Sequence, residues 1–317
     1  MRFFGITAIG IIGGLIMGYC RFHGSPESAV RTYPSPMLTR AQKTVVQPVD
    51  DDTLSDPAST PSGDDVTNPD GELAKAMASS PESRLRYKVA LLKRGRDALR
   101  LVKCYTAQLR KQEVVRGELL DEQVMSIKCR HHPFSIYLVW QIGDVGREAI
   151  YVEGKNNGKL IAHDGGWKSR LPAFSMLTDG SLAMKDARCP ITTAGLLGLT
   201  EAMIEIHQND LKRSNFASCE IDPHGRFDGR PCSMFTTKYK SADDSPVYRK
   251  SITLIDHKWN LPVQTKHFEW STTGKTKPET ELDRETIIES YSFTDIKLGC
   301  QLTDHDFERT NLEYHFH

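Results

Sequence analysis

The sequence predicts an α+β domain in which a curved antiparallel sheet is covered by two helices. Apolar and polar residues alternate with a period of two at residues 251–256, 261–270 and 286–293, as half-buried antiparallel strands require. The turns between these runs carry Gly, Asn, Asp or Pro, which favours a meander over parallel strands that need crossover helices. Two amphipathic helical segments separate blocks of strands, and this order indicates helices gathered on one face of the sheet.

The first residues predict an attachment to a membrane. Residues 3–19 form a nearly uncharged apolar run flanked by arginines, and a run of about 17 residues is at the lower limit for spanning a bilayer. An uncleaved signal anchor over residues 1–20 ranks first, and a cleaved signal peptide ranks second. Lipidation of Cys20 ranks third, because Tyr19 stands where lipoprotein signals carry a small residue. These alternatives place the protein in the cell envelope, periplasmic and anchored to the membrane, or in the secreted fraction.

Residues 21–80 are predicted to be a disordered linker. Ser, Pro, Thr and Asp dominate this segment, and such a composition buries too little apolar surface to offset the conformational entropy of folding. The linker would tether a folded domain at some distance from the membrane. The domain itself is expected over residues 81–317.

The folded domain is expected to begin with an amphipathic helix at Pro81. Leu85, Val89, Leu92 and Leu99 recur at helical spacing among arginines and lysines, which gives one apolar stripe and a basic face that we expect to be solvated. A glycine in the middle of this segment is expected to weaken the helix.

Short strands should build the rest of the domain, because turn residues recur about every 8–12 positions, as in antiparallel sheets. We expect strands at residues 103–115, 123–129, 134–141, 147–152, 159–163, 217–221, 232–239 and 248–255. The strand at 134–141 is apolar on both faces, so it should be central and covered. The expected cover is a second helix over residues 193–213, which follows Pro190 and is capped by Thr192 or Thr193.

The charge balance argues against nucleic acid as a partner. Lys plus Arg and Asp plus Glu each number 41, so the chain has no net field to attract a polyanion, and no long basic run is present.

The seven cysteines give only a weak indication of redox chemistry. Cys219 and Cys232 flank a turn-rich stretch and could form a disulfide across a hairpin, although two buried free thiols would fit the pattern equally well.

No strong catalytic or metal motif is present. The spacings of a P-loop, a dinucleotide-binding turn, a nucleophile elbow and a zinc-protease helix are all missing from the sequence. Four weaker groupings are better explained as turns or terminal residues: Cys129 with His131 and His132, His163 with Asp164, Asp304 with Asp306, and His315 with His317. We therefore expect no catalytic residue, no bound metal and no cofactor.

Aromatic residues give the clearest indication of function. They fall on or beside predicted strands, at Phe134, Tyr137, Trp140, Tyr151, Trp167, Phe268, Trp270, Tyr291 and Phe293. One interpretation is that they only fill a core. The sharper hypothesis is an apolar cavity on a curved sheet. Its lining is predicted to include Phe134, Ile136, Trp140, Tyr151, Leu199, Met203, Phe268, Trp270 and Tyr291.

Several stretches resemble a known family. They are residues 104–106, 111–113, 132–140, 146–151, 190–195, 256–263 and 302–316. This set, which spans roughly residues 84–316, resembles a group of secreted bacterial proteins known only as a domain of unknown function. That group is more distantly similar to the LolA-like superfamily of lipoprotein carriers and to stress sensors of the RseB type. The resemblance implies an incomplete antiparallel barrel, a LolA-like half-barrel, whose helices cover a site for acyl chains. It transfers no catalytic residue.

Together these observations predict a non-enzymatic envelope protein that binds a lipid, an acylated protein or another hydrophobic ligand in the concave face of the half-barrel. The second hypothesis is an interaction or sensor protein that docks another envelope protein. The third and weakest is a hydrolase built on His163 and Asp164 or on the terminal carboxylates.

Overall fold

The computed structural model describes residues 69–272 and 276–316. The predicted membrane segment at residues 3–19, Cys20 and most of the predicted linker lie outside the described residues. A short helix, α1 (Pro69–Met77), lies within the range predicted to be linker, so described structure begins before residue 81. No helix of the described part is long and apolar enough to cross a membrane.

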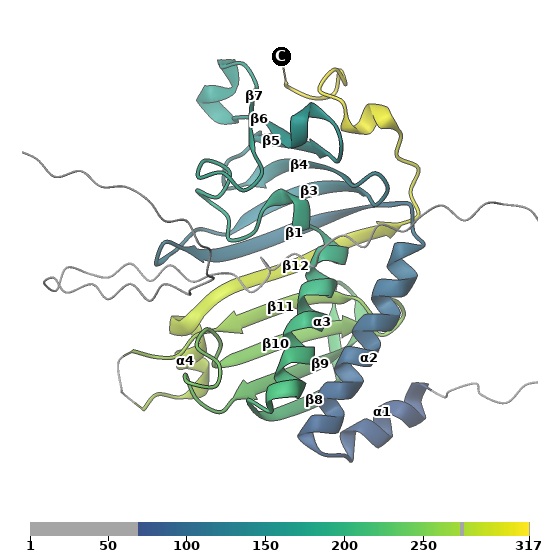
Figure 1. Ribbon diagram of the computed structural model, residues 1–317, viewed down its shortest axis with the longest axis vertical. Coiled ribbons are helices and arrows are strands. Elements are labelled where there is room, and N and C mark those ends of the chain that lie inside the picture. Colours follow the sequence, from purple (N-terminus) through teal and green to yellow (C-terminus); the bar gives the residue numbers. More distant parts are fainter. Residues whose placement is uncertain (1–68, 273–275, 317) are drawn as a thin grey trace, which may run out of the picture. The chain divides into compact units, whose positions relative to one another are not determined.

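The centre of the fold is one open antiparallel sheet of twelve strands (Figure 1), which confirms the predicted fold class. The strands are β1 (Cys104–Val115), β2 (Glu118–Leu119), β3 (Gln123–Arg130), β4 (Ser135–Ile142), β5 (Glu148–Val152), β6 (Lys159–His163), β7 (Phe174–Leu177), β8 (Phe216–Phe227), β9 (Arg230–Tyr239), β10 (Lys250–Asp256), β11 (Pro262–Phe268) and β12 (Ile287–Leu298). Their order is β7-β6-β5-β4-β3-β1-β12-β11-β10-β9-β8, and the short β2 pairs with β1 only. The sheet does not close, because β7 and β8 form its two edges.

Two meanders meet in the middle of this sheet. One runs from β1 through β3 to β7, and the other runs from β8 to β12. They are joined by the antiparallel pair of β1 and β12, in which Leu109 lies opposite Phe293 and Tyr105 lies opposite Leu298. Residues that are far apart in the sequence therefore form the central pair of strands.

Helix α2 (Pro81–Arg100) begins where the sequence predicts. The Ser80 hydroxyl accepts a hydrogen bond from the backbone N–H of Ser83 at 3.2 Å, and Pro81 occupies the first turn. The leucine stripe is buried in the core. Gly95 has a packing role, because a Cβ at this position would lie 2.2 Å from the carbonyl oxygen of Asn260. Only glycine lets the helix approach that turn so closely.

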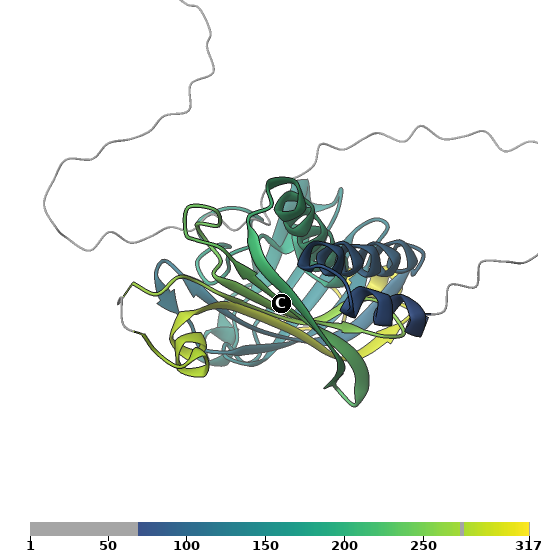
Figure 2. The same ribbon diagram turned by 90° about the horizontal axis from the view of Figure 1, so that it is seen from below.

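Helix α3 (Leu196–Arg213) lies on the same side of the sheet as α2 (Figure 2). The predicted cap at Thr192 or Thr193 is wrong: the N-cap is Gly195, whose φ is 95°, and the hydroxyl of Thr193 donates to the Pro190 carbonyl instead. The free N–H of Leu196 donates to the hydroxyl of Tyr105 at 2.9 Å. The cap of α3 is therefore supplied by a side chain of β1. A fourth helix, α4 (Glu279–Thr286), precedes β12 and was not predicted.

Strand β4 is covered on both faces, as its sequence predicts. Ile136, Leu138 and Trp140 face the main core with α2 and α3. On the other face Tyr137 stacks on Tyr314, with ring centroids 4.0 Å apart and an angle of 11° between the rings. The second cover is the C-terminal tail, residues 300–316, which also contributes Phe307 and Phe316 to this outer cluster. The tail was not predicted as a cover.

The structure contradicts the disulfide between Cys219 and Cys232. In the β8–β9 hairpin Cys219 lies opposite Thr237, whereas Cys232 lies opposite Gly225. The two thiols also belong to different apolar clusters, and both are free and buried. The turn-rich stretch between them extends the hairpin well beyond Cys219, and this moves the two residues out of register.

Candidate functional site

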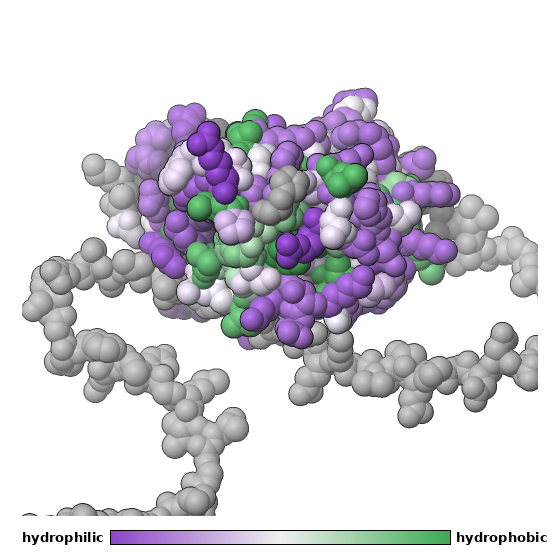
Figure 3. All heavy atoms as spheres, turned by 90° about the horizontal axis from the view of Figure 1, so that it is seen from above, coloured by the Kyte–Doolittle hydropathy of each residue, from purple (hydrophilic) through white to green (hydrophobic). Residues whose placement is uncertain are grey.

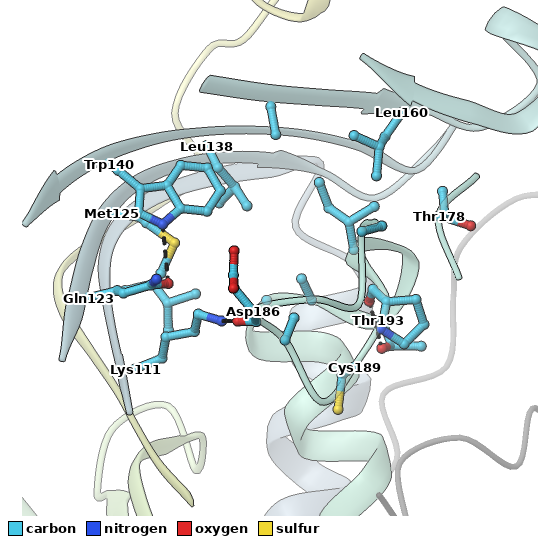
Figure 4. Close-up of a pocket in the computed structure, with 18 of the residues that line it drawn as sticks. Lys111, Gln123, Met125, Leu138, Trp140, Leu160, Thr178, Asp186, Cys189 and Thr193 are labelled. Carbon is cyan, nitrogen blue, oxygen red and sulfur yellow. Dashed lines mark hydrogen bonds between the residues drawn. The ribbon is translucent and has the colours of Figure 1, made fainter. Parts of the chain in front are cut away.

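An apolar pocket with a volume of about 150 Å³ lies between the sheet and the segment that connects β7 to α3. We call this segment, residues 178–195, the strap. Apolar side chains from the sheet and α3 form the wall: Leu109, Met125, Leu138, Trp140, Ala149, Leu160, Ala162, Met176, Leu199 and Phe293. Figure 4 shows the wall on one side and the strap on the other. A cavity of this size and character holds a molecule such as benzene.

The strap is fastened to β1 by hydrogen bonds from two cationic residues. The Lys111 ammonium donates to the carbonyl of Asp186 at 2.9 Å. The Arg188 guanidinium donates to the carbonyl of Val114 at 3.0 Å, and the backbone N–H of Arg188 donates to Glu113 at 3.3 Å. These contacts hold an irregular segment over the pocket without the continuous side-chain packing of a helix.

A buried ionic network continues from the strap into the centre of the sheet. Glu289 on β12 is fully buried, and its carboxylate lies 3.0 Å from Arg188 and 2.9 Å from the ring of His267. The hydroxyl of Tyr248 donates to the same carboxylate at 2.6 Å. Burial alone would raise the pKa of Glu289, but the His267 hydrogen bond and the charges of His267 and Arg188 outweigh it and lower the pKa to about 2. Glu289 is therefore ionised at neutral pH.

Polar side chains lie at one side of the pocket. The indole N–H of Trp140 donates to the Gln123 side chain at 3.2 Å, and the Arg147 guanidinium lies 5.0 Å from the Trp140 ring. Arg147 also pairs with Asp144 at 3.1 Å and with Asp186 at 3.5 Å. Figure 4 shows the Asp186 carboxylate pointing into the cavity. This side can therefore accept or donate hydrogen bonds to a ligand whose other end is apolar.

A wider hollow with a volume of about 760 Å³ adjoins the pocket and shares Gln123, Arg147, Met176 and Asp186 with it. We call it the outer hollow. Trp167, on its rim, is 81% exposed. Figure 3 views the end of the molecule that carries β5–β7 and shows hydrophobic patches within a mostly hydrophilic surface. The apolar pocket thus has a polar, partly open space beside it.

The structure brings three of the nine predicted lining residues to this pocket: Trp140, Leu199 and Tyr291. The other six do not line it. Ile136 and Met203 are buried in the main core, and Phe134 packs against Tyr151 with ring centroids 6.1 Å apart. Phe268 and Trp270 lie at the end of β11, where the Trp270 N–H donates to the Ser245 carbonyl at 2.7 Å and the Lys250 ammonium lies 4.9 Å from the Phe268 ring.

The sequence reasoning missed the strap and the small residues of the pocket wall. Ala149 and Ala162 lie in strands β5 and β6, directly opposite each other. Small residues at facing positions of neighbouring strands leave space that larger ones would fill. That signal was present in the sequence, whereas the strap carries no periodicity that could reveal its position.

The groupings that resemble catalytic or metal sites have structural partners. The ring of His163 is buried and lies 3.1 Å from the Ser169 carbonyl, and that of His131 lies 2.6 Å from the Val102 carbonyl. Across the described residues no group of three or more His, Cys, Asp or Glu side chains is arranged to hold a metal ion.

The acidic and basic residues of the tail pair with the sheet. Asp304 pairs with Arg130 at 2.6 Å, and Asp306 pairs with Lys128 at 2.9 Å. His315 lies 2.8 Å from Glu148, while His317 lies outside the described residues. These contacts hold the tail against the outer face of the sheet.

Several solved structures are similar to this chain at low identity. The lipoprotein LppX of Mycobacterium tuberculosis is 10% identical, the match covers 69% of this chain and 98% of that one, and the TM-score is 0.40. The MucA/MucB complex of Pseudomonas aeruginosa gives 13% identity, 70% and 60% coverage and a TM-score of 0.39. A LolA superfamily protein of Nitrosomonas europaea gives 8% identity, 73% and 98% coverage and a TM-score of 0.29.

Comparison with curated protein sequences finds no significant match. A family model does match, and it covers residues 102–316, from the strand that begins the sheet to the end of the tail. The match includes the pocket wall, the strap and both meanders. The chain therefore belongs to the family described as protein of unknown function DUF1571.

Proposed function

We propose that this protein is a non-enzymatic envelope protein that binds the apolar end of an amphipathic ligand between the sheet and the strap. The observation that carries the proposal is the pocket itself: an apolar cavity of about 150 Å³ that shares its polar side with a wider hollow. A ligand with an acyl chain and a polar group matches this arrangement.

The inner pocket would take the hydrocarbon end of such a ligand. Its walls are aliphatic and aromatic, so each buried methylene group contributes about 0.8 kcal/mol. The polar end would lie in the outer hollow, where Gln123, Arg147 and Asp186 offer both donors and acceptors. The opposite charges of Arg147 and Asp186 favour a polar or zwitterionic group over a multiply charged one.

A whole acyl chain needs more room than the pocket offers in this conformation. Under the proposal the strap moves to admit it. The strap contributes one wall and is held by the hydrogen bonds of Lys111 and Arg188 and by the packing of a few apolar side chains. Loops fastened at a few points open at lower free energy than packed helices do.

Filling the pocket tests the proposal. Ala149 is buried in the pocket wall, so Ala149→Leu adds methyl groups inside the cavity. The probe is dansyl-undecanoic acid, whose fluorescence rises when it enters an apolar site. We expect Ala149→Leu to weaken binding of this probe by about tenfold or more, because even one extra methylene group in an apolar pocket has an effect of this size.

The matched control is Ala173→Leu, which adds the same atoms on the outer face beside the tail cluster. It should bind the probe as the parent protein does. Equal affinity for the parent and both variants would refute binding in this pocket, and near-identical circular dichroism spectra must show that all three are folded.

A second candidate function is docking of another envelope protein at the rim of the outer hollow. Val145, Trp167 and Leu182 on this rim are 60%, 81% and 54% exposed, and exposed Trp is typical of the centre of protein interfaces. A photo-crosslinking residue at position 167 in intact cells should give one dominant protein adduct if this function holds. The adduct should survive Ala149→Leu, which separates docking from ligand binding.

The envelope location is part of the proposal and rests on the apolar run at residues 3–19. Fractionation of cells that express the full chain should place it with membranes. A variant that lacks this run should be found in the soluble fraction of the cytoplasm. Recovery of the full chain in the cytoplasm would exclude an envelope function.

A further inference from the structure

Two cysteines meet at the end of the seam between the two meanders. Cys104 is the first residue of β1, and Cys300 follows the end of β12. Their sulfur atoms lie 3.9 Å apart although the residues are 196 positions apart in the sequence. Cys104 Sγ also contacts the carbonyl oxygen of Cys300.

The backbone holds this pair in place. The N–H of Gly299 donates to the carbonyl of Cys104 at 3.0 Å, which continues the β1–β12 ladder by one step. Gly299 has a φ of 75°, a conformation that glycine adopts at little cost, and it turns the chain so that Cys300 comes beside Cys104. The proximity of the thiols therefore follows from strand register and a turn, and does not depend on a mobile loop.

The surroundings distinguish the two thiols from each other. Cys104 is 4% exposed, whereas Cys300 is partly exposed. Cys300 is therefore the thiol that a reagent in solution can reach first. Burial, with the neighbouring Cys104, raises the pKa of Cys300 to about 11, so Cys300 is mostly protonated at neutral pH and reacts faster as the pH rises.

A third cysteine, Cys129, lies on a neighbouring strand, and its position relative to this pair decides whether it could compete for the disulfide. It pairs in register with Tyr105, whose side chain belongs to the main core beneath α3. Because successive side chains of a strand point to opposite faces, Cys104 lies on the face of the tail and Cys129 on the face of the helices. Cys129 thus serves as a control for specificity.

We propose that Cys104 and Cys300 form a redox-sensitive dithiol site, and that oxidation by a small disulfide such as oxidised glutathione joins them in a disulfide that fastens the tail to β1. The reaction is two thiol–disulfide exchanges. The Cys300 thiolate attacks the glutathione disulfide, and one glutathione thiolate leaves. The Cys104 thiolate then attacks Cys300 Sγ and expels the second. The two cysteines lose two protons and two electrons, and the glutathione disulfide becomes two thiols.

Formation of the disulfide would restrict the movement of the tail. The tail covers the outer face of β4 to β6 through Phe307, Tyr314 and Phe316, and the disulfide would fix the point where the tail leaves the sheet. A cross-link between residues so far apart removes a large part of the freedom of the unfolded chain. Oxidation should therefore raise the melting temperature by about 5–10 °C.

The test uses the purified full chain incubated with oxidised glutathione at pH 8.5, alkylated and digested without reduction. We expect mass spectrometry to find one cross-linked pair of peptides, carrying Cys104 and Cys300, two hydrogens lighter than the sum of the separate peptides. Alkylation of both residues in the folded, oxidised sample would overturn the proposal, as would a link from either residue to Cys129.

Variants tie the cross-link to stability. Cys300→Ser should lose the oxidation-dependent rise in melting temperature, while Cys232→Ser, another buried free cysteine, should keep it. If Cys300→Ser failed to fold, Cys104→Ala would repeat the test from the buried partner. A rise that persisted in Cys300→Ser would show that another pair is responsible and would refute the assignment.

Discussion

The two halves of the sheet are covered in different ways on the side that holds the core. Strands β8–β11, the helix half, lie under α2 and α3 (Figure 1), whereas the strap covers the pocket that is lined mainly by strands β3–β7, the pocket half. A helix presents a side chain at every 1.5 Å of its length and fills the space above a sheet evenly. The strap contacts the rest of the domain through a few polar groups and through Ala183, Ile191 and Ala194, and a cavity is left beneath it. The contrast shows that the connection above a sheet decides whether it forms a core or a binding site.

The halves also differ in the polar groups that they bury. The helix half contains a cluster in which the hydroxyl of Tyr239 donates to Asp210 at 2.8 Å and the ring of His207 lies 3.0 Å from the same carboxylate. Burial, and then the charge of Lys88, lower the pKa of His207 to about 4. In the pocket half another set of polar groups, Gln123, Arg147 and Asp186, lies at the side of the cavity, where solvent or a ligand can reach them.

The largest effect is expected from the residue that connects the two halves. Glu289→Ala removes the carboxylate that pairs with Arg188 of the strap and with His267 of β11. The buried side chains of Arg188, His267 and Tyr248 then lose this partner, which costs about 3–5 kcal/mol. Urea denaturation should show this loss in the free energy of unfolding, together with faster proteolysis of the strap. A loss below about 1 kcal/mol would mean that the network does not join the halves.

Acid should reproduce part of this loss. The pKa of Glu289 is about 2 in the folded protein, below its ordinary value of 4.5, so its contribution is complete above pH 4.5 and disappears as the pH falls toward 2. In Glu289→Gln the stability should change less over this range. Parallel curves for the parent and the variant would contradict the assignment of the low pKa.

A smaller effect, confined to one half, is expected from the tail. Tyr314→Ala removes the ring that stacks on Tyr137 and the hydroxyl that hydrogen-bonds the Asp306 carbonyl at 2.8 Å. We expect a loss of about 2–3 kcal/mol. Hydrogen exchange should quicken in β4–β6 and stay unchanged in β8–β11. Tyr314→Phe keeps the ring and serves as the control. If hydrogen exchange quickened equally in both halves, the tail would not stabilise the pocket half alone.

The smallest effect, of opposite sign, is expected in the helix half. Lys88 is fully buried beside Phe235, and no hydrogen-bond partner of its ammonium is found among the described residues. Burial lowers its pKa from 10.5 to about 8. Lys88→Met should therefore stabilise the protein at pH 7 by about 1–2 kcal/mol, measured by urea denaturation.

The pH dependence checks the cause of this gain. Because the folded state holds the Lys88 proton less tightly than the unfolded state, the contribution of Lys88 to parent stability should rise between pH 8 and 10.5. That rise should be missing in Lys88→Met. A destabilised variant with the rise intact would show that Lys88 has a partner of its own.

The strands could be predicted because their information is local. Alternation of apolar and polar residues predicted all three C-terminal strands, an apolar run on both faces predicted the covered strand β4, and residues 159–163 match β6 at both ends. The cap of α3 could not be predicted, because Tyr105 supplies it from a strand some ninety positions away. The burial of Lys88 could not be predicted either, because it depends on the distant Phe235, and the helical pattern alone predicts a solvated basic face.

The set of residues predicted to line a cavity overlaps only partly with the lining of this pocket. Alternation shows which face of a strand a residue occupies, and Trp140 and Tyr291 from the predicted set do line the pocket. It does not show which part of that face is covered by helix and which by loop. Phe268 and Trp270 share the pattern and lie away from the pocket, because strand order places β11 in the other half. Only the pairing of β1 with β12 settles which strands lie under the strap.

That pairing also sets the order in which the chain can fold. Strand β1 pairs with β2 and β3, which follow it directly in the chain, whereas its other neighbour, β12, is the last strand of the second meander. Until β12 is in place, the first meander has an unpaired edge in what becomes the middle of the sheet. Such long-range pairing is slow to form. A chain of this topology therefore keeps one edge of its first meander unpaired until the second meander has formed.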